Sequence, residues 1–219
     1  MDNQIIRKDG KNKFVEFLND GFEIGKISIN FVEYDENQAK GNRIKQQIKT
    51  YMDFSTFLAF AQRIKSGNLL KGLYAKQQKG EWPEELIAQG GTTAQSLAKR
   101  NMSRADGRSE ARQIKINLGN KVLFKAVSGP AYIGPTGLIV METDANKKAI
   151  IEKQIAVALD PKDLAEIVLI VEAHINGFIA AGYSQGKFVN EYFEKKNANN
   201  ENPQSQTTPQ NENPFINMG

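Results

Sequence analysis

The sequence predicts an α+β fold built from a duplicated unit of four β-strands followed by one helix. The main observation is a motif that occurs twice at a constant spacing. Residues 107 positions apart match as Gln47 and Gln154, Ile48 and Ile155, and Asp53 and Asp160. In both copies the aspartate follows an apolar strand and precedes apolar residues at helical spacing. A spacing this long indicates a domain-scale duplication rather than a solenoid repeat.

The first copy, residues 1–65, reads as four strands and a helix. We expect strands over residues 13–18, 22–24, 26–34 and 43–52. The third alternates apolar and polar residues, as in a half-buried antiparallel strand. Asp53 is expected to cap the following helix through its carboxylate, and Gly67 to end it.

The second copy, residues 112–183, has the same order. Strands are expected over 114–118, 121–126, 137–141 and 150–159. Phe31–Val32 precede Leu138–Ile139 by the same 107 residues, which extends the match. Asp160 and Pro161 then open a helix with a cap and a proline at its first position.

The other segments fit the repeat poorly. Residues 66–111 are expected to be an irregular connector, with a short amphipathic helix around Leu69–Tyr74 and a mobile basic stretch over 90–108. Residues 184–196 are expected to form a closing helix. Residues 197–219 are dominated by Asn, Gln, Pro, Ser and Thr, which predicts a disordered tail.

The composition of the chain indicates what class of protein it is and where it is located. The 219 residues are 40% apolar and 25% charged, as in ordinary soluble proteins, and there are no cysteines. The beginning of the chain has no apolar signal region, and the most apolar stretch, 164–183, carries Glu166, Glu172 and His174. We therefore expect a cytoplasmic protein that does not cross a membrane.

Catalytic signals are weak. His174 is the only histidine, no phosphate-binding loop sequence occurs, and the carboxylates are scattered along the chain. The expectation is a protein that is not an enzyme and needs no cofactor or metal.

Positive charge is concentrated in the middle of the chain. Residues 90–125 contain eight Lys or Arg and only Asp106 and Glu110 as acids, although the whole chain has a net charge of +4. Such a stretch is commonly a solvated loop. Here the charge continues into expected strands and is accompanied by aromatic residues, a combination that suits single-stranded nucleic acid.

The candidate nucleic-acid-binding residues follow from this pattern. Phe124 is either a base contact or a core residue, whereas Tyr132, in a Gly-Pro bend, is the better stacking candidate. The cations and aromatics proposed to contact nucleic acid are Arg112, Lys115, Lys121, Lys125, Tyr132, Lys99, Arg100, Arg104, Arg108, Lys13, Lys26 and Phe124.

The last residues carry a second signal. Pro214 and Phe215 restore apolar character at the end of a polar tether, and one buried aromatic can anchor a peptide to a partner. The alternative is a frayed terminus without a role.

Together, the two β-rich units and the basic strands around residues 112–126 resemble the Whirly and positive-cofactor-four family of single-stranded DNA-binding proteins, which includes members from phages and mobile elements of Gram-positive bacteria. The resemblance covers about residues 10–65 and 110–180. It implies two curved antiparallel sheets that hold single-stranded DNA, helices packed behind them, and a homo-oligomer.

The end of the chain resembles the tail of bacterial single-stranded DNA-binding proteins, which finishes in Pro-Phe and recruits replication and repair enzymes. Here four residues follow Phe215, and Asn and Gln replace most of the acidic residues.

The expected function is therefore sequence-independent single-stranded DNA binding in replication, recombination or transfer of a phage or mobile element. The tail is expected to reach a replication or recombination protein. Two alternatives remain: a regulator that binds RNA or double-stranded DNA, and a structural or adaptor protein whose tail recruits a partner.

Overall fold

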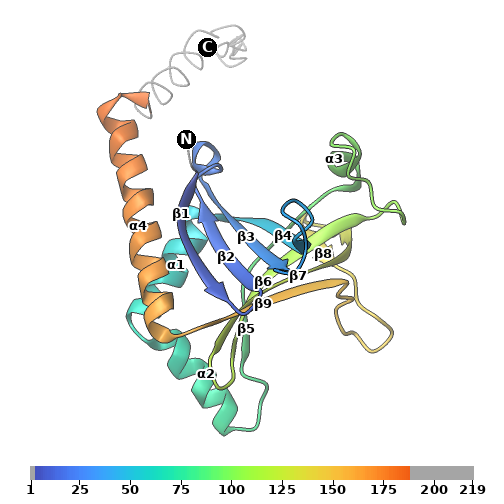
Figure 1. Ribbon diagram of the computed structural model, residues 1–219, viewed down its shortest axis with the longest axis horizontal. Helices are drawn as coiled ribbons and strands as arrows, with labels where there is room; N and C mark the ends of the chain where they lie inside the picture. The colour runs from blue at the N-terminus through green and yellow to red at the C-terminus, as the bar shows by residue number, and fades with distance from the viewer. Residues whose placement is uncertain (1–2, 188–219) are drawn as a thin grey trace, which may run out of the picture. The chain divides into compact units, whose positions relative to one another are not determined.

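The computed structural model describes residues 3–187. The chain divides into two compact units within its last helix, one ending at Asn176 and the other beginning at Gly177. The first unit is an α+β structure with two antiparallel sheets, as the sequence predicts (Figure 1).

The first sheet, sheet A, is a four-stranded antiparallel meander in the order β1-β2-β3-β4. Its strands are β1 (Gln4–Gly10), β2 (Lys13–Leu18), β3 (Lys26–Tyr34) and β4 (Ile44–Asp53). The expected strand at 22–24 is instead a short 3-10 helix, η1 (Phe22–Ile24), which ends at Gly25 in the left-handed conformation. The prediction of a strand there was wrong because Gly21 and Gly25 enclose a turn too short for strand pairing.

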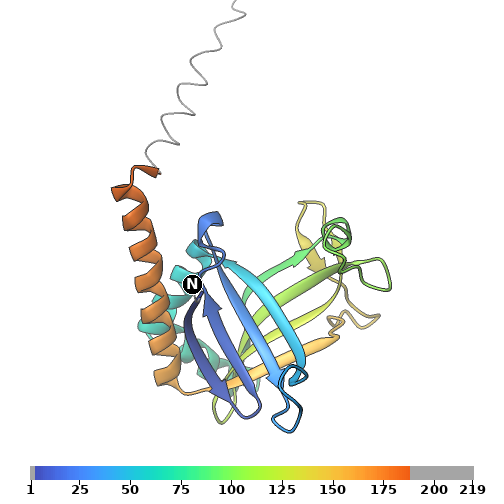
Figure 2. The same ribbon diagram turned by 45° about the horizontal axis from the view of Figure 1, so that its top comes forward.

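The second sheet, sheet B, pairs in the order β5-β6-β7-β8, and β9 also pairs with β7. Its strands are β5 (Glu84–Thr92), β6 (Ser109–Leu118), β7 (Val122–Ile133), β8 (Ile139–Met141) and β9 (Lys153–Leu159). Sheet B is strongly curled (Figure 2). The curl brings β8 close to β5: a Cβ on Gly91 would lie 2.7 Å from Cγ2 of Ile139.

The core lies between the two sheets and the first helix. Phe124 of β7 packs against Phe17 and Phe31 of sheet A, with ring centroids 6.1 and 5.3 Å away. Phe60 of helix α1 (Phe54–Lys65) completes the cluster at 6.2 Å. Phe124 is 1% exposed, so its assignment as a nucleic-acid contact is wrong. Strand alternation places it on the face opposite the neighbouring lysines, where apolar burial stabilises it.

The junction before α1 differs in detail from the prediction. Asp53 precedes the helix, but its carboxylate makes no capping hydrogen bond. It accepts instead from Nζ of Lys26 at 2.6 Å, across the β3–β4 pair. Gly67 ends the helical run in the left-handed conformation, as expected, and leads into α2 (Asn68–Gln78).

The final helix, α4 (Pro161–Ser184), begins at the predicted proline. Its Leu164, Ile167, Val168, Val171 and Ile175 are buried. By length and composition alone α4 is long and apolar enough to cross a bilayer, and the core helices of soluble proteins meet the same criteria. In the first unit its acidic residues form ion pairs: Lys8 with Glu166 and Lys65 with Glu172.

Two strands lie outside the predicted set. No strand is predicted at the position of β1, and β5 lies in the segment predicted to be an irregular connector. The connection between β5 and β6 consists of the short helix α3 (Ala94–Ala98) and the turns after it.

The pairing also changes one predicted equivalence. β8 is three residues long and pairs only with the far end of β7, whereas β3 lies between β2 and β4. The match of Phe31–Val32 to Leu138–Ile139 therefore does not reflect equivalent positions in the two sheets. β7, which pairs with both β6 and β9, occupies the place that β3 has in sheet A.

Candidate functional site

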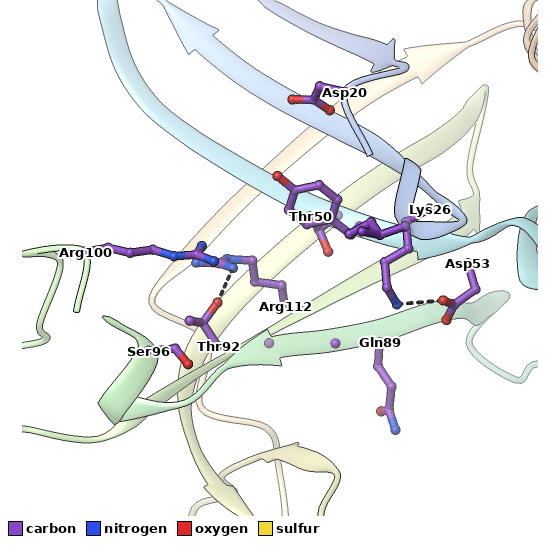
Figure 3. A pocket seen from close by; sticks show the side chains of 13 residues that line it. Asp20, Lys26, Thr50, Asp53, Gln89, Thr92, Ser96, Arg100 and Arg112 are labelled. Carbon is purple, nitrogen blue, oxygen red and sulfur yellow. Dashed lines mark hydrogen bonds and ion pairs between the residues drawn. The ribbon is translucent and has the colours of Figure 1, made fainter. Parts of the chain in front are cut away.

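A cleft of about 440 Å³ lies between the edge strands of the two sheets (Figure 3). β4 is the last strand of sheet A and β5 the first of sheet B, so each has a free edge among the strands described. The residues that line it are Asp20, Ile24, Lys26, Thr50, Tyr51, Asp53, Gln89, Gly90, Gly91, Thr92, Ser96, Arg100 and Arg112.

Sheet A contributes one wall with three kinds of group. Tyr51 of β4 is 41% exposed, and Thr50 beside it is 5% exposed. The Lys26–Asp53 ion pair lies at one end of this wall. Successive residues of a strand point to opposite faces, so Thr50 and Tyr51 line the cleft from the two sides of the β4 edge.

Tyr51 is held in place by its surroundings. A Cβ on Gly21 would lie 3.3 Å from Cδ1 of Tyr51, so the ring packs closely on the glycine backbone. Nζ of Lys49 lies 5.8 Å from the ring centroid, and the same amine binds Asp20 at 2.6 Å. Burial alone would lower the pKa of Lys49, but the hydrogen bond that its amine donates to Asp20 and nearby negative charge raise it. A fixed aromatic ring with accessible surface is suited to stacking.

Sheet B contributes a wall of bare backbone and arginine. A Cβ on Gly90 would meet no atom within 4 Å, so the missing side chain leaves open space. Opposite Gly90 in the β5–β6 register is Arg112, which donates to Oγ1 of Thr92 at 3.0 Å and also pairs with Glu110. Arg100 follows α3 and points toward Arg112 in Figure 3.

Three of the predicted cations therefore meet in this cleft: Lys26, Arg100 and Arg112. They come from β3, the segment after α3, and β6, which are far apart in sequence. Arg100 alone of the three has no side-chain hydrogen bond or ion pair within residues 3–187.

Lys115 and Lys125 lie elsewhere. They are opposite each other in the β6–β7 register, and both bind Glu84, with Lys115 at 3.2 Å. Because side chains alternate along β6, Arg112 is on the other face from Lys115. The candidate cations of β6 and β7 are therefore divided between the two faces of sheet B.

Carboxylates also neutralise much of the expected basic stretch. Arg104 binds Asp106 and Glu152 at 2.7 and 2.8 Å, and Arg108 binds Asp106 and Glu142. The hydrogen bond from Arg104 and the backbone N–H of Arg108 lower the pKa of Asp106. The segment between α3 and β6 is thus fixed by ion pairs to residues after β8.

The remaining predicted residues are distributed over the surface. Lys13 pairs with Glu33 at 3.3 Å, and Lys121 pairs with Asp160 at 3.2 Å. Tyr132 is 52% exposed near the end of β7, and Lys99 is exposed without an ion pair in the described part of the chain. None of these four lines the cleft. Pro214 and Phe215 lie outside the described residues.

Sequence reasoning missed Thr50, Tyr51 and Thr92 as site residues. Tyr51 follows Lys49 in an alternating strand, and this pairing of a cation with an aromatic is the only local signal for it. Thr92 had no such signal, since its role depends on β5 pairing with β6. Between residues 3 and 187 no group of three or more His, Asp or Glu side chains could hold a metal ion.

Comparisons with protein-family models, with curated proteins and with solved structures found no match to this chain.

Proposed function

We propose that the chain binds single-stranded DNA without catalysing a reaction, and that the cleft between β4 and β5 is the primary contact. The observation that carries this proposal is the combination of an exposed, fixed tyrosine and converging arginines in one cleft. Aromatic stacking with backbone neutralisation is the usual means of binding single strands without sequence preference.

The proposal includes a duplicated, Whirly-like architecture, which two recurring features support. Lys26 pairs with Asp53 before α1, and Lys121 pairs with Asp160 before α4. Gln47 lies opposite Val32 in sheet A, and Gln154 lies opposite Val127 in sheet B.

On this interpretation the units are β1-β2-β3-β4-α1 and β5-β6-β7-β9-α4. The matched spacing is 95 residues from Val32 to Val127 but 107 from Gln47 to Gln154. The difference corresponds to the longer connection between β7 and β9, which contains β8. An inserted hairpin accounts for both spacings.

The biological setting that we propose is cytoplasmic. The protein would act as a homo-oligomer in the replication, recombination or transfer of a phage or mobile element, and its tail would reach a partner protein. This setting rests on the family resemblance of the sequence, whereas the geometry of the cleft supports only the proposed ligand, single-stranded DNA.

Fluorescence anisotropy of labelled oligonucleotides tests the proposal. The full chain is titrated against single-stranded DNA at low and near-physiological salt, with RNA of the same sequence and duplex DNA as competitors. We expect salt-dependent binding to the single strand that duplex competes away poorly. Equal competition by the duplex would favour a double-strand binder. Absence of binding at both salts would favour the adaptor alternative.

A charge-matched pair of variants locates the contact. Combined alanine substitution of Lys26, Arg100 and Arg112 removes the cations of the cleft, and combined substitution of Lys115, Lys121 and Lys125 removes three cations outside it. The first triple variant is expected to weaken binding more and to reduce the salt dependence. A larger loss from the second would place the strand along the outer face of sheet B.

A further inference from the structure

Two guanidinium groups converge in the cleft with only part of their charge neutralised. Arg100 and Arg112 point toward each other (Figure 3). Arg112 binds Thr92 and Glu110, whereas the Arg100 side chain makes no hydrogen bond or ion pair within the described residues. The two guanidinium groups repel each other, and an anion bound between them would be attracted by both.

The other charges around the cleft do not supply that anion. Asp53 pairs with Lys26 at 2.6 Å, and Asp20 pairs with Lys49 at 2.6 Å. Glu110 is already bound to Arg112. The charge of Arg100 is therefore left for a ligand.

The opposite wall offers a polar group and an aromatic ring. Thr50 lines the cleft, and its hydroxyl forms no hydrogen bond to another group among residues 3–187. The hydroxyl is available to a polar group of a bound molecule. The ring of Tyr51, 41% exposed on the other side of the β4 edge, is available to an apolar or aromatic face.

From this arrangement we infer that the cleft holds a single nucleotide unit. The phosphate lies between Arg100 and Arg112, and the base lies against the ring of Tyr51. The volume of about 440 Å³ is at the small end of ligand pockets and suits one nucleotide rather than a run of stacked bases. The choice of a nucleotide as the ligand rests on the proposed function. The position of the anion rests only on the arrangement of Arg100 and Arg112.

NMR titration of the full chain with three small probes tests this inference: thymidine monophosphate, thymidine and inorganic phosphate. Arg100→Ala is expected to weaken the binding of thymidine monophosphate and inorganic phosphate about tenfold and to leave thymidine unchanged. Tyr51→Leu is expected to weaken the binding of thymidine monophosphate and of thymidine and to leave the binding of inorganic phosphate unchanged.

Lys99→Ala is the matched control, because Lys99 is a neighbouring exposed cation that does not line the cleft. It should change the affinity for each probe less than about twofold. Thermal unfolding of each variant establishes that it is folded, and Arg100→Gln provides a second variant with a polar side chain.

The outcomes separate this inference from the proposed function. Oligonucleotide binding that Arg100→Ala and Lys99→Ala weaken equally, without saturable binding of the monophosphate, would overturn the nucleotide site and leave single-strand binding in place. Arg100-dependent binding of the monophosphate by a chain that binds no oligonucleotide would overturn the proposed function and keep the site. No binding of any probe or oligonucleotide would overturn both.

Discussion

At the scale of single residues, alternation along β6 and β7 separates core from surface. Even-numbered positions such as Ile114, Ile116 and Phe124 are buried between the sheets, and the odd-numbered Lys115 and Lys125 face outward. A basic sequence segment therefore supplies both the centre of the core and an ion-pair network.

Phe124→Ala tests the first role. Its ring contacts Phe17, Phe31 and Phe60, so truncation leaves a cavity and should cost about 3–5 kcal/mol of the free energy of unfolding. Tyr132→Ala, at an exposed position of the same strand, should cost less than about 1 kcal/mol. Urea unfolding measures both, and a similar small loss in the two variants would contradict the core assignment.

Glu84→Gln tests the network. Glu84 separates two lysines that are directly opposite in the β6–β7 register, so its loss leaves their repulsion uncompensated. We expect a loss of about 1–2 kcal/mol at neutral pH. Glu36→Gln, in an exposed turn, is the control and should change the free energy of unfolding by less than about 0.5 kcal/mol.

The same residue predicts a pH dependence. Burial alone would raise the pKa of Glu84, but the hydrogen bond from Lys125 and the charges of both lysines lower it below the ordinary value of 4.5. A carboxylate whose pKa is lowered by folding stabilises the fold above its unfolded-state pKa, and that contribution is lost as the pH falls. The free energy of unfolding of the wild type should thus decrease more steeply below about pH 5 than that of Glu84→Gln. Parallel curves would contradict this.

At the scale of elements, much of the fold could be predicted because most strands carry their own signal. The alternation of β3 and the apolar residues of β2 and β9 are local properties. β5 has no such pattern: Gln89, Gly90 and Gly91 give little apolar content, and the strand exists because β6 offers a pairing edge. Ion pairs such as Glu84 with Lys125 depend on strand register, which local patterns do not specify.

Close backbone approach gives an element-scale prediction at Gly129 in β7. A Cβ there would lie 2.0 Å from the carbonyl oxygen of Ile150, so Gly129→Ala must displace the segment that leads into β9. We expect a loss of about 1–3 kcal/mol in thermal or urea unfolding.

Gly72→Ala is the matched control, since Gly72 lies inside α2 and a Cβ there meets no atom within 4 Å. It should stabilise the chain by about 0.5–1 kcal/mol through helix propensity. Destabilisation by both substitutions, or by neither, would contradict the packing described for β7.

At the scale of the whole molecule, the two sheets share one core. The apolar face of sheet A is completed by Phe124 from sheet B and by α1, and Gln46 of β4 donates to the carbonyl of Gln154 at 3.1 Å. The two proposed repeats are therefore not independent folding units, although the sequence reads as two similar halves.

A fragment of residues 1–80 tests this interdependence. It contains sheet A, α1 and α2 but lacks the phenylalanine that packs on Phe17 and Phe31. We expect circular dichroism to show no cooperative thermal unfolding, because the exposed core face cannot be buried within the fragment. Cooperative unfolding of the isolated fragment would show that sheet A folds alone.

The free edges of β4 and β5 also affect the solubility of the molecule. An unpaired strand edge accepts the backbone of another extended chain, which is a common route to aggregation. In this protein, charged Lys49 and Asp53 lie along one edge, and Gly90 and Gly91 weaken the other as a pairing template. The ligand proposed for the cleft would cover both edges, so the contacts that bind it would also protect the folded chain from self-association.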